Sequence, residues 1–184
     1  MKVIGFIASP RKNGNTSKLV KEILKGAAEK GAQTKLYHLN DLNMKGCQSC
    51  YACRKIPNCV LKDDFSSIID EIKNAHAVVL GSPVYMWQMN SQAKTFTDRL
   101  YPFIDMELKT RFENPKPMVL AYTQGSPDSN SFQNAFDQHK NVLNFMGFDV
   151  KEILTAAGNR EKDDILRNTE ILSKAKSAGA NLVS

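Results

Sequence analysis

Five short apolar runs alternate with segments of helical periodicity, and this alternation restricts the possible folds more than any other feature of the sequence. The first run, residues 2–8, is almost continuously apolar and partly β-branched, which is typical of a strand covered on both faces in a parallel sheet. After a turn-rich segment at 9–15, apolar residues recur at the spacing of one helix face, and Gly31 can end this helix. The apolar face consists of Leu19, Val20, Ile23, Leu24, Ala27 and Ala28.

The rest of the chain continues the same pattern. Further strands are expected at 33–38, 77–81, 118–122 and 148–154, and further helices at 65–74, 92–101, 132–146 and 163–178. Strands and helices that alternate at this spacing predict right-handed crossovers and a doubly wound sheet. With five strands, the flavodoxin-like order 2-1-3-4-5 is the natural candidate. We therefore predict a single α/β domain over residues 1–184, with a cysteine-rich insertion between the second strand and the helix at 65–74.

Charge and hydropathy exclude several kinds of partner. Lys and Arg outnumber Asp and Glu by 25 to 19, so the net charge is +6, which permits an acidic partner such as a phosphorylated cofactor. The basic residues are scattered and form no stripe interleaved with aromatic residues, which argues against nucleic acid. The apolar stretches are too short to span a membrane, and the N-terminus lacks the pattern of a signal peptide. We expect a cytoplasmic protein.

The loop after the first strand is dense in hydrogen-bond donors. Ser9, Thr16 and Ser17 carry hydroxyls, Asn15 an amide and Arg11 a positive charge. The N-terminus of the following helix adds unpaired N–H groups and a partial positive charge. Such a loop can surround a terminal phosphate, although it lacks the Lys of a P-loop and the spacing of a dinucleotide fingerprint. The alternative is an ordinary polar turn in which Thr16 or Asn15 caps the helix.

Two further loops are expected at the same edge of the sheet. The loop after the third strand contains Pro83, Val84, Tyr85, Met86 and Trp87, and it is unusually rich in large side chains. Such a segment can supply the flat apolar wall and the backbone hydrogen bonds that an isoalloxazine ring requires. Local core or a subunit interface is the alternative for its three largest side chains. The loop after the fourth strand is small and polar and can close the other side; it contains Thr123, Gln124 and Gly125.

The sequence resembles a known family at two of these loops. Residues 8–19 are similar to the opening of NADPH-dependent FMN reductase-type flavoproteins, and residues 82–85, followed by Lys94, Phe96, Asp98 and Arg99, are similar to their second signature. The resemblance covers residues 1 to about 158. It implies FMN, with the phosphate near Ser9, Arg11, Asn15, Thr16 and Ser17 and the ring near residues 83–87 and 123–125. Ala8 stands where relatives commonly have Gly.

All four cysteines of the chain lie in a connection, residues 39–62, that shows no convincing periodicity. Cys47, Cys50, Cys53 and Cys59 give the spacing C-x2-C-x2-C-x5-C. Four thiolates from one compact loop are the ligand set of a 4Fe-4S cluster. The motif also resembles that of the iron–sulfur flavoprotein family, which has it between the second strand and the second helix.

Other interpretations of the cysteines remain open. A zinc site is one, although structural zinc sites usually take two separated ligand pairs. Disulfides are another, disfavoured in a reducing cytoplasm. A third is that the cysteines are vestigial, thiol-redox or packing residues of a plain FMN reductase. The histidines at 38, 76 and 139 form no ligand pattern and are interpreted as structural.

These observations predict an FMN-dependent oxidoreductase that passes electrons between a 4Fe-4S cluster and FMN. The donor is NAD(P)H or a low-potential electron carrier, so the partners are small-molecule or protein redox partners. No catalytic acid can be assigned. The alternatives are an NAD(P)H-dependent FMN or quinone reductase without a cluster, and a non-catalytic thiol redox sensor. A homo-oligomer, dimer or tetramer, is expected because a long cysteine loop beside a shallow flavin site needs cover from a neighbour.

Overall fold

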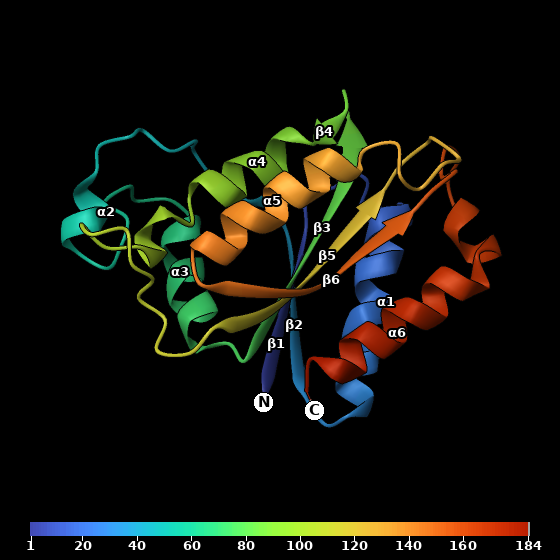
Figure 1. The fold of residues 1–184 in the computed structure, drawn as a ribbon, viewed down its shortest axis with the longest axis horizontal. Helices are drawn as coiled ribbons and strands as arrows, with labels where there is room; N and C mark the ends of the chain where they lie inside the picture. The colour runs from blue at the N-terminus through green and yellow to red at the C-terminus, as the bar shows by residue number, and fades with distance from the viewer. Residues whose placement is uncertain (184) are drawn as a thin grey trace.

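A computed structural model describes residues 1–183, in which a central parallel sheet carries helices on both faces (Figure 1). Five strands pair in parallel in the order β2-β1-β3-β5-β6. The order reverses at β1, because the chain first adds β2 on one side of it and then β3 on the other. The strands are β1 (Lys2–Ile7), β2 (Gln33–His38), β3 (Ala77–Tyr85), β5 (Lys116–Thr123) and β6 (Phe148–Ala156).

The predicted α/β parallel sheet is confirmed, but the expected number and order of strands are corrected. Residues 1–183 form six strands instead of five, because β3 continues past Gly81 to Tyr85 and folds back into the short strand β4 (Gln88–Met89). Met86 and Trp87 make the turn between β3 and β4, and both have positive φ values, 45° and 67°. Two successive positive φ values are typical of the tight turn in a two-residue β-hairpin.

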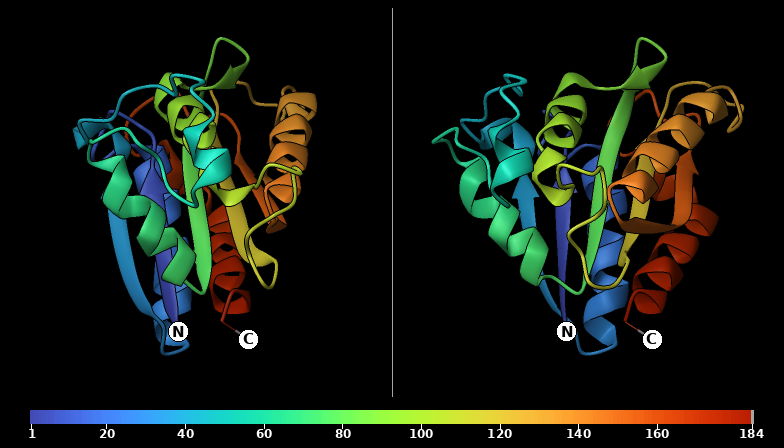
Figure 2. Two further views of the ribbon diagram at one scale, coloured as in Figure 1. Left: turned by 90° about the vertical axis from the view of Figure 1, so that its left-hand side faces the viewer. Right: turned by 60° about the vertical axis from the view of Figure 1, so that its left-hand side comes forward.

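Helices cover the two faces unequally. The helices α1 (Asn15–Glu29) and α6 (Thr169–Asn181) lie side by side on one face, whereas α3 (Phe65–Asn74), α4 (Ser91–Asp98) and α5 (Gln133–Phe145) cover the other (Figures 1 and 2). Successive side chains of β1 point to opposite faces of the sheet, so that Val3 packs toward α1 and Ile4 toward α3. Two hydrophobic cores therefore enclose the sheet.

The connections differ from expectation at three places. The helix expected at 92–101 ends at Asp98, and a 3₁₀ turn, η2 (Tyr101–Phe103), follows it. The helix expected at 163–178 is divided into η3 (Asp164–Arg167) and α6. The connection after β2 contains η1 (Leu39–Asp41) and the short helix α2 (Ala52–Lys55), which extends to the side of the molecule in Figure 1. None of the helices in residues 1–183 is long and apolar enough to cross a membrane.

A buried histidine joins three elements on the α4–α5 side of the sheet. The Nδ1 atom of His139 in α5 is hydrogen-bonded to the hydroxyl of Tyr122 in β5, and its Nε2 atom lies 2.9 Å from the hydroxyl of Thr97 in α4. Burial, together with the charge of Lys94, lowers the pKa of His139 to about 4. The structural interpretation of this histidine agrees with these contacts.

The close packing of α1 on α6 can be tested at Gly179. A Cβ atom added there would lie 1.8 Å from the carbonyl oxygen of Ile23 in α1. Helix propensity alone would make Gly179→Ala stabilising by up to about 1 kcal/mol. We expect the backbone clash to dominate, with a loss of about 1–3 kcal/mol in urea unfolding. Gly46→Ala, with nothing within 4 Å of the new Cβ, is the control. A Gly179→Ala protein more stable than the parent would contradict this packing.

The pKa of His139 predicts a pH-dependent stability. Between pH 6.5 and 4 the unfolded chain takes up a proton on this residue and the folded protein does not, so the free energy of unfolding falls as the pH falls. A depression from about 6.5 to about 4 corresponds to about 3 kcal/mol at the acid end of this range. Urea unfolding of His139→Gln should give a lower stability at pH 7 but a flatter profile from pH 7 to 4. Parallel profiles for the two proteins would show that His139 does not stay neutral.

Candidate functional site

A cleft of about 210 Å³ opens at the carboxyl edge of the sheet, where the loops after the neighbouring strands β1 and β3 lead to opposite faces. In a doubly wound sheet this switch point is the place where ligands bind, because the loops leave it in opposite directions. The loops after β1, β3, β5 and β6 all contribute to it. The lining residues are Ser9, Arg11, Gly14, Asn15, Thr16, Pro83, Val84, Tyr85, Thr123, Gln124, Gly125, Asn159 and Arg160.

The loop after β1 is closed by its own hydrogen bonds. The Ser9 hydroxyl accepts from the backbone N–H of Arg11 at 3.1 Å, and the carbonyl of Arg11 accepts from the Ser17 hydroxyl at 3.1 Å and the Gly14 N–H at 3.0 Å. Ser17 is fully buried and supports the loop from behind instead of lining the cleft. No side chain caps the N-terminus of α1. Its free N–H groups are therefore available to an anion.

Three polar side chains connect the loops to one another. The hydroxyls of Thr16 in α1 and Thr123 at the end of β5 lie 2.6 Å apart and are both buried. The Asn15 amide donates to the carbonyl of Glu161 at 2.8 Å, and its oxygen accepts from the backbone N–H of Ile165 at 3.4 Å. Asn15 thus holds the segment after β6 against the start of α1. These contacts connect three of the four loops of the cleft, those after β1, β5 and β6.

Two buried amide oxygens of cleft residues have no hydrogen-bond partner within residues 1–183. They are Oε1 of Gln124 and Oδ1 of Asn159. The Gln124 amide nitrogen is engaged, because it donates to the carbonyl of Asp128 at 2.7 Å. Buried acceptors without a donor are costly, so such atoms call for a ligand or water that donates to them. The ribityl hydroxyls and the imide N–H of FMN are donors of this kind, and the polar lining fits this cofactor.

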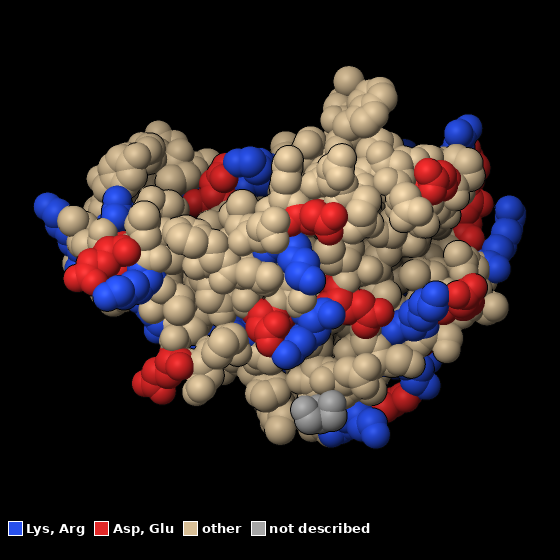
Figure 3. Space-filling model, viewed as in Figure 1, with Lys and Arg blue, Asp and Glu red and all other residues tan. Residues whose placement is uncertain are grey.

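The segment predicted to flank the flavin ring is divided by the β3–β4 hairpin. Pro83, Val84 and Tyr85 line the cleft. Met86 and Trp87 lie at the hairpin tip with 83% and 68% of their surface exposed, and they are not among the lining residues. The hairpin forms an uncharged projection at the top of the molecule (Figure 3). The Trp87 ring contacts Phe132 edge-on, with the centroids 6.4 Å apart.

Sequence reasoning did not identify three residues of the cleft. Gly14 is the N-cap of α1, and Asn159 and Arg160 follow β6. Arg160 Nε donates to the carbonyl of Gly125 at 3.1 Å, which joins the loops after β5 and β6. The sequence did contain a signal for Asn159 and Arg160, because they follow the last strand. The carboxyl ends of all parallel strands lie at the same edge of the sheet, where the cleft is expected.

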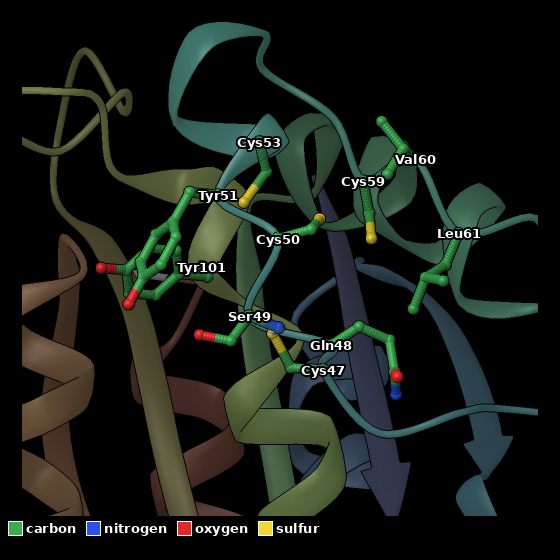
Figure 4. A pocket seen from close by; sticks show the side chains of 10 residues that line it. All are labelled: Cys47, Gln48, Ser49, Cys50, Tyr51, Cys53, Cys59, Val60, Leu61 and Tyr101. Carbon is green, nitrogen blue, oxygen red and sulfur yellow. Dashed lines mark hydrogen bonds between the residues drawn. The ribbon is translucent and has the colours of Figure 1, made fainter.

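The four cysteines line a second cavity, of about 130 Å³, beside α2 (Figure 4). All four are free thiols; Cys53 is buried, Cys59 is half-buried, and Cys47 and Cys50 are exposed. Their side chains surround one common space in Figure 4, with Tyr51 and Tyr101 on one side. Burial, followed by the proximity of the other three cysteines, raises the pKa of the Cys53 thiol. Positive φ values at Ser49 and Tyr51, 52° and 57°, turn the backbone twice between the first three cysteines.

Two arginines attach the cysteine segment to the rest of the fold. Arg99, at the end of α4, makes a two-point ion pair with Asp63 at 2.6 and 3.0 Å, donates to the carbonyl of Lys45 at 2.7 Å, and lies 3.5 Å from the Cys59 sulfur. Burial alone would raise the pKa of Asp63, but the hydrogen bonds from Arg99 and Lys45 outweigh it and hold this pKa below its usual value. Arg111 donates to the carbonyls of Cys53 and Arg54 at the end of α2, at 3.0 and 2.7 Å.

The donor set of this cavity fits an iron–sulfur cluster in kind and number, because such clusters are held by four cysteine thiolates. Nowhere in residues 1–183 do three His, Cys, Asp or Glu side chains converge closely enough to hold one metal ion. A zinc site would need its sulfurs at about 2.3 Å from a single centre, and a cluster is larger than one ion. Cluster binding by these residues is taken up below as a proposal.

The fold is that of a flavodoxin-like α/β protein, and a polar cleft opens at the carboxyl edge of its sheet. Residues 1–159 match the family model described as NADPH-dependent FMN reductase. The chain therefore belongs to the NADPH-dependent FMN reductase family. This confirms the predicted family.

Individual relatives agree with this assignment. An iron–sulfur flavoprotein of Methanocaldococcus jannaschii is 38% identical over 112 residues, which are 60% of this chain and 58% of that protein. The chain spans about half the length of the iron–sulfur flavoproteins that it matches. A putative NAD(P)H-dependent FMN-containing oxidoreductase of Bacillus subtilis is 24% identical over 95% of this chain and 94% of its own length.

The fold is shared with solved structures. The NAD(P)H:quinone oxidoreductase of Methanothermobacter marburgensis superposes with a TM-score of 0.77 and 19% identity over 100% of this chain and 98% of that chain. At this identity the likeness concerns the fold alone. It confirms the predicted flavodoxin-like architecture at that coarser level.

Proposed function

We propose that this chain is an electron-transfer oxidoreductase in which FMN occupies the cleft and exchanges electrons with a 4Fe-4S cluster held by Cys47, Cys50, Cys53 and Cys59. The observation that carries the proposal is the single cavity shared by all four free thiols in a chain of an FMN reductase family. The names of relatives that are 32–38% identical over about half of the chain support it. When bound, the two groups supply the redox chemistry, and the chain supplies their positions and electrostatic environment.

In this proposal the FMN phosphate lies at the loop after β1. The uncapped N–H groups of α1 and the hydroxyl of Ser9 bind it, and Arg11 adds a positive charge. The free oxygens of Gln124 and Asn159 accept hydrogen bonds from donors of the cofactor. Pro83, Val84 and Tyr85 provide the apolar wall of the ring. Met86 and Trp87, on the exposed tip, remain candidates only for a contact at the outer edge of the ring.

Helix α4 links the two sites within one chain. The side chain of Asn90, its N-cap, donates to the carbonyl of Ala8 at 2.8 Å, beside the cleft. At the other end of the helix, Arg99 reaches Cys59. Eight helical residues rise by about 12 Å. One short helix therefore extends from the edge of the cleft to the cysteine cavity.

The electron donor is proposed to be NAD(P)H or a low-potential carrier, and the protein a cytoplasmic homo-oligomer. A cluster-free NAD(P)H-dependent FMN or quinone reductase is the second candidate. It is favoured by the B. subtilis relative, which matches along nearly the whole chain. A non-catalytic thiol sensor is a third candidate, but it leaves the cleft and its unpaired acceptors without a ligand.

The cluster can be tested by iron and sulfide assays on anaerobically purified protein. We expect about four irons and four sulfides per chain together with flavin absorption, because the cysteine count matches one cubane cluster. Cys50→Ser should lose most of the iron while FMN is retained, whereas Ser49→Ala, in the same turn, should keep both. A yellow parent protein without iron would refute the cluster and leave the cluster-free reductase.

Binding of FMN to the cleft can be tested at Gln124. Gln124→Leu removes a buried acceptor that the proposal assigns to FMN. The loss of one hydrogen bond, about 1 kcal/mol, should weaken the Kd for FMN by about five- to tenfold in fluorescence titrations of the deflavinated protein. Gln138→Leu, on the exposed side of α5, serves as the control. Equal Kd values for the parent and Gln124→Leu would show that FMN does not bind at this position.

A further inference from the structure

The guanidinium of Arg99 is buried within the structure that holds the cysteines. Its side chain is 1% exposed, and that of Asp63 is 3% exposed. The group lies over the Phe65 ring, with Cζ 4.9 Å from the ring centroid. Its Nη1 and Nη2 atoms donate to the two oxygens of Asp63, which lies two residues before the first residue of α3. These contacts fix the orientation of the Arg99 guanidinium, in contrast to a charged side chain that moves freely at the surface.

The same guanidinium contacts only one of the four cysteines, Cys59, in the described part of the chain. Its Nη2 atom donates to the Cys59 sulfur at 3.5 Å. Cys59 stands apart from the other three in the sequence, since it follows α2 and is separated from Cys53 by five residues. Through the carbonyl of Lys45 and the carboxylate of Asp63, Arg99 also binds both sides of the cysteine segment, two residues before Cys47 and four residues after Cys59. A single side chain thus fixes the span of the segment and contacts its last thiol.

We propose that Arg99 is a positioning residue for the cluster. Its N–H···S hydrogen bond holds Cys59 in place as the fourth ligand and sets the reduction potential of the cluster. This inference rests on the proposed function, because it requires the cluster. Among residues 1–183, no other guanidinium or ammonium group is hydrogen-bonded to a cysteine sulfur. The buried Nε atom of Arg99 also has no hydrogen-bond partner in that part of the chain.

The effect of Arg99 on the reduction potential follows from the change in cluster charge on reduction. One-electron reduction by the external donor adds one negative charge to the cluster, with no proton or bond transferred. A hydrogen bond to a ligand sulfur stabilises the more negative, reduced form and raises the potential. Loss of the Arg99 donor should therefore lower the cluster potential.

Substitution of Asp63 is expected to shift the reduction potential of the cluster in the opposite direction to substitution of Arg99. Its carboxylate neutralises Arg99, so that the pair carries little net charge toward the cluster. Asp63→Asn keeps one oxygen, which at the Oδ2 position can accept from Arg99 Nη1 and from the Lys45 N–H, but it leaves the guanidinium charge uncompensated. The potential should then rise. A residue that only supports the fold would not shift the potential in opposite directions on these two substitutions.

The test is an EPR-monitored redox titration of anaerobically purified protein, with iron per chain measured on each sample. Relative to the parent, we expect a lower midpoint potential for Arg99→Gln and a higher one for Asp63→Asn. Arg99→Gln leaves a buried carboxylate unpaired and can fail to fold. The double variant Arg99→Met with Asp63→Leu removes both charges and keeps the volume apolar, and it should still show a lowered potential. Lys55→Gln, an exposed charge on α2 with no hydrogen bond to sulfur, is the control and should leave the potential unchanged.

The outcomes separate this inference from the proposed function. If the parent contains about four irons and the potentials of Asp63→Asn and the double variant equal that of the parent, the positioning role of Arg99 is refuted and the cluster stands. If both variants shift in the same direction, the electrostatic argument is refuted. If the parent contains no iron, the proposed function fails, and the inference fails with it.

Discussion

Parallel strands can be joined only by connections that cross back over a face of the sheet, and this constraint determines where the chemistry of this protein can lie. The crossovers of the chain are made by helices on two faces, so all loops that leave carboxyl ends meet at one edge (Figure 2). At β1 the order reverses, and the loops after β1 and β3 diverge. The cleft exists because of this divergence. Its polar contacts, such as Thr16 to Thr123, then hold the loops at the spacing that a cofactor needs.

The cysteine segment depends on the same architecture in a less direct way. It has only one short helix of its own, and its backbone turns through positive φ values at Ser49 and Tyr51. Arg99 and Arg111, from the end of α4 and the connection to β5, bind its carbonyls and fix its position against the sheet layer. These hydrogen bonds within the chain restrict the conformations that the segment can adopt.

The regular elements could be predicted from the sequence because their signal is local. The apolar run of β1 and the helical spacing of α1 each specify their own conformation and burial. The β3–β4 hairpin could not be predicted in this way, since residues 82–85 were interpreted as a loop and the turn at Met86 and Trp87 lacks the usual Gly or Asn. Its consequence is that these two side chains lie on an exposed tip instead of in the cleft.

At both sites, the polar contacts between residues far apart in the sequence are the features that are hardest to predict from it. The close spacing of the four cysteines predicts a ligand set for a cluster; all four line one cavity, and cluster binding stays a prediction. The pairing of Arg99 with Asp63 joins residues 36 positions apart and depends on how α4 packs beside α3. Asn159 and Arg160 reach the cleft only because β6 is the edge strand next to β5. No local pattern contains the Arg99–Asp63 pairing, whereas the position of Asn159 and Arg160 after the last strand is a signal in the sequence.

The central claim, that one chain binds both FMN and a 4Fe-4S cluster, is tested most directly by an anaerobic reductive titration that counts electrons per chain. A chain with FMN and one cluster should take up about three electrons, two on the flavin and one on the cluster. Uptake of two electrons, with flavin absorption alone changing, would contradict the account and identify a cluster-free flavin reductase.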